Sequence, residues 1–341
     1  MGKIVFLAAL LGLFFSGSVE AAEGDLLFIV GRNVNKTEYD IYSANPVTLQ
    51  FRKIIDYGLN PTWSPDRQKI AYFSLKALDD KMYSYQVALG IANRDGTKNW
   101  KPKLKNLRGI ILDLAWSPDG KEIAVAAGSW ILIASLHEEI LAFEGPGQIQ
   151  QLVWLSSANG IVFYAKEGIF LLNPKTREHT LVSPHGWFPK VLPGTDRLLY
   201  LKETEGDSKI INMVMRDLKN GSEEVLLTNV SVPLPKKSVY CVSENGKKVI
   251  FYPGGAKASE QQAVYGVYDV LTKTVRYYRT DGGVMEALSH DGRKIAGVFK
   301  FGDKAGYGVW DLVTGKKSLI REIRDGEIDK RVFGFSRLMD W

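Results

Sequence analysis

The sequence has little of the material from which covalent cross-links and most catalytic centres are built. Its 341 residues include one cysteine, Cys241, so no internal disulfide can form and the fold must be held by its own core. The surrounding letters, VYCVS, favour a small buried side chain on a strand over a reactive thiol. No P-loop, dinucleotide fingerprint or H-E-x-x-H spacing occurs. The absence of G-x-S-x-G excludes a fused serine hydrolase, and we expect no metal and no cofactor.

Long hydrophobic runs are also missing. The apolar run over residues 4–15 is too short to cross a bilayer as a helix. It follows Lys3 and precedes small residues, which predicts a secretory signal peptide over residues 1–21, cut after Ala21. An uncleaved N-terminal anchor is the alternative, and the lack of a cysteine there excludes lipid attachment. We therefore expect residues 22–341 to form one domain of a periplasmic or secreted protein, without a stable transmembrane anchor.

The charge balance is moderately basic. The net charge is +6, with basic residues concentrated over residues 98–108, at Lys236 and Lys237, and over residues 321–331. For an exported protein, anionic lipid, polysaccharide or an acidic partner are better candidates than nucleic acid. The alternative is that these charges form a solvated surface that keeps the protein soluble.

The chain does contain a repeated phrase. Residues 63–71 read WSPDRQKIA and residues 116–124 read WSPDGKEIA. A bulky apolar residue, a turn and a second apolar stretch recur at spacings of 53, 38, 37, 51, 46 and 47 residues, the size range of a four-stranded propeller blade. The seven positions are Trp63, Trp116, Trp154, Val191, Val242, Leu288 and Phe335.

Each part of the phrase has a structural reason. Alternation before the turn marks a strand, and the Pro, Asp and Gly of SPDG favour a tight hairpin. The last repeat stops after one strand, VFGFSRL, whereas the segment after residue 22 supplies three strands without a first. Joining them completes one blade from both chain ends and removes exposed sheet edges. We predict an all-β, seven-bladed β-propeller of four-stranded blades, with six blades as the alternative if the weak repeat at Val191 merges with a neighbour.

The WSPDGKEIA phrase resembles the propeller repeats of TolB-like proteins. The resemblance covers nearly the whole chain after residue 21 but is strict only at residues 63–71 and 116–124. It implies a propeller and, for TolB itself, a periplasmic role in the Tol-Pal envelope system. TolB carries an α/β domain before its propeller, and here strand-like sequence begins almost at the cleavage site. Neither TolB's own role nor a partner-contacting residue therefore transfers.

Candidate binding residues lie where the outer strand of one blade leads to the inner strand of the next, because these connections converge on one face around the funnel. His185 is the best placed of the four histidines: His290 lies at a hairpin turn, while His137 and His179 fall near outer strands. Trp187 and Phe188 are predicted in a loop between Gly186 and Pro189, where aromatic side chains near basic residues would anchor a peptide. The alternative is that Trp187 caps the core between blades. The full candidate set is Asn60, Arg108, Gln148, His185, Trp187, Phe188, Lys236 and Lys237.

Three functions remain open at this point. The leading one is a non-catalytic exported propeller that binds a protein or peptide of the cell envelope. The second is an envelope enzyme, a polysaccharide lyase or hydrolase, with its site in the funnel. The third is a structural module of a larger envelope assembly. Propellers host many functions, so the fold does not choose among these.

Overall fold

The computed structural model describes residues 24–33, 38–77, 85–100, 111–135, 139–204, 206–231, 240–253, 263–280, 283–323 and 339–340. Every regular element in these ranges is a β-strand. No helix long and apolar enough to cross a membrane occurs in the part of the chain that is described. The expected signal peptide, residues 1–21, and the candidates Arg108, Lys236 and Lys237 lie outside the described residues.

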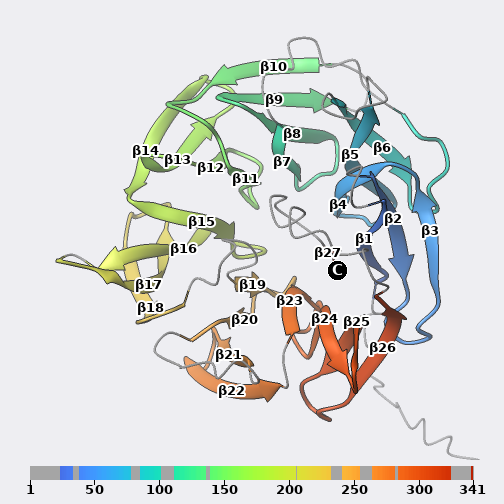
Figure 1. Ribbon diagram of the computed structural model, residues 1–341. Helices are drawn as coiled ribbons and strands as arrows, with labels where there is room; N and C mark the ends of the chain where they lie inside the picture. Colours follow the sequence, from blue (N-terminus) through green and yellow to red (C-terminus); the bar gives the residue numbers. More distant parts are fainter. Residues whose placement is uncertain are drawn as a thin grey trace, which may run out of the picture.

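The strands form seven antiparallel sheets around a common axis, as Figure 1 shows. Numbered along the chain and listed from the axis outwards, blade 1 contains β27 (Met339–Asp340), β1 (Leu26–Asn33), β2 (Glu38–Ala44) and β3 (Phe51–Ile55). Blade 2 contains β4 (Gly58–Trp63), β5 (Lys69–Ala77) and β6 (Tyr85–Asn93). Blade 3 contains β7 (Ile111–Trp116), β8 (Glu122–Ala127), β9 (Trp130–Ser135) and β10 (Glu139–Glu144).

The remaining blades follow the same order. Blade 4 contains β11 (Gln151–Trp154), β12 (Ile161–Ala165), β13 (Gly168–Asn173) and β14 (Glu178–Pro184). Blade 5 contains β15 (Gly186–Val191), β16 (Arg197–Thr204), β17 (Asp207–Asp217) and β18 (Glu223–Leu227). Blade 6 contains β19 (Tyr240–Val242), β20 (Lys248–Phe251), β21 (Ala263–Asp269) and β22 (Thr274–Thr280). Blade 7 contains β23 (Gly283–Leu288), β24 (Lys294–Phe301), β25 (Lys304–Asp311) and β26 (Lys317–Glu322).

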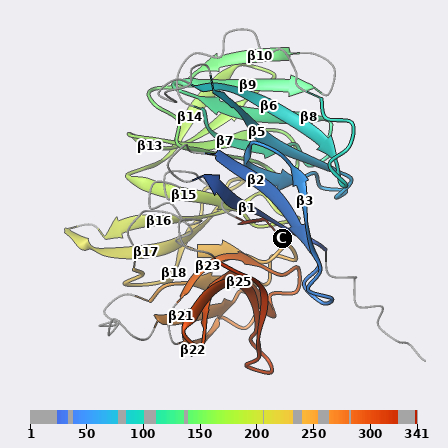
Figure 2. The same ribbon diagram turned by 45° about the vertical axis from the view of Figure 1, so that its right-hand side comes forward.

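The seven-blade prediction is confirmed, and the six-blade alternative is wrong. The weak repeat at Val191 ends the innermost strand of its own sheet, blade 5. In blade 2 an isolated bridge between Ile91 and Trp100 marks the place of the fourth strand. Figure 2, turned by 45°, shows the sheets side by side around the ring with β1 and β2 in the foreground.

The predicted closure through both chain ends is confirmed. Leu27 pairs with Asp340 and Phe28 with Met339, so a C-terminal strand is the innermost strand of blade 1. The segment VFGFSRL, to which we assigned this strand, lies outside the described residues, and the observed pair falls just after it. The sheet edge that an open ring would expose is thereby covered.

The repeated hairpin owes its shape to its serine as well as to its Pro, Asp and Gly. In blade 3, Ser117 Oγ donates a hydrogen bond to Asp119 Oδ1 at 2.7 Å and accepts one from the N–H of Glu122 at 2.9 Å. Gly120 has a φ of +68°, the left-handed conformation that glycine adopts without steric cost. The same serine contacts recur in three other blades, at Ser64, Ser243 and Ser289.

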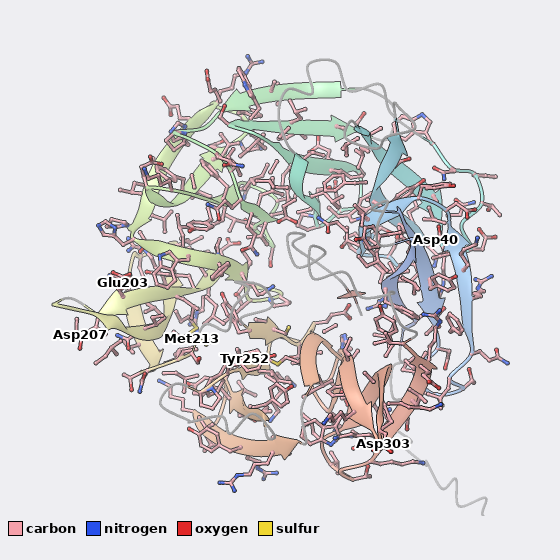
Figure 3. The ribbon with its side chains drawn as sticks, viewed as in Figure 1. Asp40, Glu203, Asp207, Met213, Tyr252 and Asp303 are labelled. Carbon is pink, nitrogen blue, oxygen red and sulfur yellow. The ribbon has the colours of Figure 1, made fainter. Side chains whose placement is uncertain are left out.

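A hydrogen bond crosses each of the seven boundaries between neighbouring blades. Three come from the indoles of the tryptophan repeats, three involve tyrosine hydroxyls, and one comes from Gln151. Tyr252, labelled in Figure 3, accepts from the N–H of Met285 at 3.4 Å. The other six are Trp63 Nε1 to Asp25 O (3.0 Å), Trp116 Nε1 to Thr62 O (3.3 Å), Trp154 Nε1 to Ala115 O (3.1 Å), Gln151 Nε2 to Pro189 O (3.3 Å), Tyr240 Oη to Leu199 O (2.8 Å) and Tyr307 Oη to Ile29 O (3.1 Å).

Candidate functional site

Strand direction divides the ring into two faces. On one, the junction face, each outermost strand leads to the innermost strand of the next blade, and second strands turn into third strands. Among the described residues the junctions are 56–57, 145–150 and His185, and the turns include Gly128–Ser129 and Lys166–Glu167. On the opposite face, the turn face, lie the repeated hairpins such as that of Ser117.

His185 is the whole connection between blades 4 and 5. It is exposed, has a φ of +58°, and stands alone between β14 and β15. Gly168, at the start of β13, packs closely against the backbone just before His185. A Cβ atom at position 168 would lie 2.3 Å from the carbonyl oxygen of Ser183. The exposed His185 side chain is therefore attached to a short, closely packed backbone segment.

Trp187 and Phe188 are not in a loop, so that prediction is wrong. Both belong to β15, are half-buried, and pack against the hydrophobic cluster that contains Leu199 and Tyr240. Phe188 has a φ of +52°, and the register of β15 shifts between Trp187 and Lys190. A β-bulge therefore places both aromatic rings at the start of the strand, partly in the core and partly towards the junction face.

Asn60 occupies the equivalent bulge of blade 2. Residues 57–61 (YGLNP) and 185–189 (HGWFP) share Gly at the second position, Pro at the fifth, and positive φ at the first and fourth. Asn60 is only 2% exposed, and its Nδ2 donates to Leu112 O at 3.3 Å. Its amide therefore links blade 2 to blade 3, and the prediction that Asn60 lies in a loop is wrong, because it belongs to β4. The shared x-Gly-x-x-Pro pattern was the sequence signal for both bulges.

Tyr57, next to this bulge, is held by a buried carboxylate. Its backbone N–H donates to Asp40 Oδ1 at 3.2 Å, and Asp40, labelled in Figure 3, is 5% exposed. The Tyr57 side chain itself is 41% exposed on the junction face. The junction between blades 1 and 2 thus also presents a side chain from a fixed backbone.

Gln148 is exposed on a connection that is firmly held. Three backbone hydrogen bonds fix the segment, from Gly145 N to Ser129 O at 2.7 Å, from Ile149 N to Gly128 O at 2.8 Å, and from Gln150 N to Tyr164 O at 2.9 Å. The Ile149 side chain is fully buried beneath it. Gln148 and His185 are thus exposed side chains on the two junctions that precede and follow blade 4.

Two tyrosines of blades 4 and 5, Tyr164 and Tyr200, have raised pKa values, and the Tyr200 hydroxyl donates a hydrogen bond to Glu223. Burial, together with a hydrogen bond to Glu223, raises the pKa of Tyr200 to about 12. Burial also raises the pKa of Tyr164. Both hydroxyls therefore stay protonated at neutral pH. The described ranges contain no group of three or more His, Cys, Asp or Glu side chains arranged to hold a metal ion.

The turn face carries a polar cluster that joins blades that are not neighbours. Glu244, in a hairpin of blade 6, pairs with Arg67 of blade 2 through one oxygen and with His290 Nδ1 of blade 7 through the other, at 2.9 Å. The expectation that His290 lies at a hairpin turn is confirmed, and His179 lies in the outermost strand β14 as expected. His137 lies outside the described residues.

Comparison with known proteins identifies the fold. No protein-family model and no curated protein matches the chain. Among solved structures, TolB from Acinetobacter baumannii matches with 16% identity and a TM-score of 0.50, over 76% of this chain and 64% of that one. The chain has the TolB-like propeller fold. It spans only 64% of the length of that TolB.

Two other solved structures that are similar in fold to this chain are named for quite different activities. An oligogalacturonate lyase in complex with manganese has a TM-score of 0.59 and 12% identity, over 91% of this chain and 90% of the lyase. Hydrazine synthase from Kuenenia stuttgartiensis has a TM-score of 0.52 and 11% identity, over 75% of this chain and 77% of that one. At these identities the likeness is one of fold, and the site residues must carry any functional conclusion.

Proposed function

We propose that this TolB-like propeller is an exported, non-catalytic protein that binds a protein or peptide of the cell envelope through its junction face. The observation that carries the proposal is a pair of exposed side chains on the junctions before and after blade 4. Gln148 lies on a hydrogen-bonded segment, and His185 lies between two paired strands. Half-buried Trp187 and Phe188 follow directly and add aromatic surface of the kind that anchors partners. Pre-organised backbone lowers the entropic cost of binding.

Export and location belong to the same proposal. The signal peptide predicted over residues 1–21 would deliver the protein to the periplasm or the medium. The sequence places three basic residues in the connections between blades: Arg108, Lys236 and Lys237. Their positive charge would favour an acidic partner face or peripheral contact with an anionic surface. N-terminal sequencing of the exported protein tests this part, with Ala22 as the expected first residue.

The binding proposal is tested by site-specific photocrosslinking in intact cell envelopes. A photoreactive residue at position 148 or 185 should give the same protein adduct, because the two positions share one face. The matched controls are positions 176 and 220, where Thr176 and Asn220 lie in exposed turns of blades 4 and 5 on the turn face. An adduct formed equally from positions 176 and 220, or none from positions 148 and 185, would contradict the proposal.

A second candidate is an envelope polysaccharide lyase or hydrolase acting in the funnel. It is favoured by the similarity to the oligogalacturonate lyase, which extends over nine-tenths of both chains. The absence of a three-ligand group among the described residues makes it the weaker candidate. Incubation with oligogalacturonate and manganese tests it: new unsaturated ends, absorbing in the ultraviolet, would establish a lyase, and their absence together with an unchanged melting temperature would exclude this substrate.

A further inference from the structure

The outer rim of the ring is formed by the fourth strands, and one of them differs from the rest. In the five others that the structure describes, β3, β10, β14, β18 and β26, the register with the third strand shifts at a bulge or irregularity. β22 instead pairs with β21 over seven consecutive positions, Ala263–Thr280 to Asp269–Thr274, without a shift. It lies on the outside of blade 6 (Figure 1).

This regularity matters because β22 is an edge strand. Every second residue of such an edge turns its N–H and C=O groups away from the sheet, where another strand can pair with them. Bulges interrupt that row and twist an edge away from incoming chains. β22 contains neither a bulge nor a proline, and no described strand pairs with its outer side, so the strand itself keeps an unbroken template for an added strand.

The exposed side chains of β22 are basic and aromatic. Arg276 and Arg279 are exposed, and Tyr277 between them is 62% exposed. No ion pair of either arginine is present among the residues that the structure describes. Val275 packs towards the cluster shared with blade 5, whereas Tyr278 packs towards the cluster shared with blade 7. Alternation along the strand therefore places Arg276 and Arg279 on opposite faces of the blade.

We propose that the outer edge of β22 binds an extended acidic segment of a partner protein by strand addition. Main-chain pairing supplies the contact, and side chains of alternating direction supply the selectivity. The two arginines are three residues apart and lie on opposite faces of the blade. The matching segment therefore carries two acidic residues three positions apart. It also carries an apolar residue beside Tyr277. A second copy of this chain is disfavoured as occupant, since its own arginines would approach Arg276 and Arg279.

The β22 surface lies on the rim and does not depend on the junction face. An acidic segment held there leaves Gln148 and His185 untouched, so the two proposals fail or succeed separately. Strand addition at blade 6 would allow one partner to hold the ring from its side while the junction face engages another ligand.

The test is hydrogen exchange of the full chain with a synthetic probe. The probe is a nine-residue capped peptide of alternating Val and Thr that begins with Val and carries Glu at its third and sixth positions, so that antiparallel pairing places the Val at its fifth position opposite Tyr277. It should slow exchange of the backbone amides of residues 274–280, and protection should weaken with added salt. Two control peptides carry Lys in place of Glu, or Pro in place of the fifth residue, and neither should protect.

Variants separate the charge from the backbone contribution. Arg276→Glu with Arg279→Glu should weaken probe binding about tenfold or more, since two favourable pairs become repulsive. Lys175→Glu with Lys219→Glu makes the same charge change in exposed turns of other blades and should leave binding nearly unchanged. Equal binding by both double variants, or protection outside residues 274–280, would overturn the proposal. A third result would also overturn it: the double variant Arg276→Thr with Arg279→Thr self-associates, while the probe fails to protect the wild-type protein. The two arginines would then serve only to prevent other strands from pairing with the edge.

Discussion

Replacing Ser117 with Ala removes the side chain that ties the repeated hairpin together. Its Oγ both donates to Asp119 Oδ1 and accepts from the N–H of Glu122, and Ser117 is only 2% exposed. A hydrogen bond to a charged group contributes about 1.5–3 kcal/mol, and a buried donor left without an acceptor costs about 1–3 kcal/mol. Because the two effects share one atom and both hydrogen bonds are only partly buried, we expect a loss of about 1–2 kcal/mol in the free energy of unfolding.

The same substitution has a pH signature. The hydrogen bond from Ser117, followed by that from the N–H of Lys121, lowers the pKa of Asp119 from its ordinary 3.8. A carboxylate whose folded pKa is depressed stabilises the fold above its unfolded pKa and loses this contribution as the pH falls through its folded pKa. The destabilisation in Ser117→Ala should therefore be larger at about pH 7 than at about pH 3. Asp119 is half-exposed, so solvent screening keeps this pH-dependent part small.

Urea unfolding and calorimetry at the two pH values measure both effects. A loss of this size should lower the melting temperature by roughly 3 °C for a domain of this length. Ser156→Ala is the matched control: Ser156 follows Leu155, which takes the place of Ser117 in the hairpin of blade 4. It should change stability by less than about 0.5 kcal/mol. An equally large loss in the control, or a negligible one in Ser117→Ala, would refute the role of the serine.

Three further substitutions or treatments test other parts of the structure. Trp187→Ala should cost about 2 kcal/mol, because the half-buried indole packs on the cluster shared by blades 5 and 6, and an unchanged urea midpoint would contradict this. Arg321→Ala should cost about 1 kcal/mol by removing the guanidinium that lies 5.5 Å from the Phe51 ring centroid and 5.9 Å from that of Tyr42, and calorimetry against Lys300→Ala checks it. Cys241 is 9% exposed, so a thiol reagent should modify it only as fast as the fold opens, and rapid labelling of the native protein would show otherwise.

The architecture followed from the sequence because the repeat specifies both a strand period and a turn. Trp116 and the SPDG turn fix the end of one strand and the start of the next, and the spacing of repeats fixes the size of a blade. Even the weak repeat at Val191 could be placed, since the apolar pair after its turn returns as a buried second strand. Closure could be predicted because the two chain ends lacked complementary parts of a single sheet.

The candidate site was less predictable because burial depends on local backbone geometry. Gly and Pro around Trp187 were interpreted as a loop, but in residues 185–189 they allow a bulge within a strand. The equivalent bulge of blade 2 turns Asn60 inward, where its amide donates a hydrogen bond to Leu112 O of blade 3. The roles of His185 and Gln148 as binding residues remain predictions. His185 is exposed because it forms a one-residue junction, and Gln148 because backbone hydrogen bonds hold its junction in place. Amino-acid composition does not predict either backbone geometry.

The pairing of β27 with β1 also determines how the ring would respond to a pulling force. Every other pair of adjacent strands within a blade is joined by covalent chain, whereas the innermost strand of blade 1 is held to its neighbour by pairing alone. The two strands are antiparallel, so the first residue of β1, Leu26, and the last residue of β27, Asp340, lie at the same end of the pair. Tension applied there would peel the contacts one after another instead of loading them together. We therefore expect β27 to separate from β1 at low force, so that blade 1 opens before any other blade unfolds.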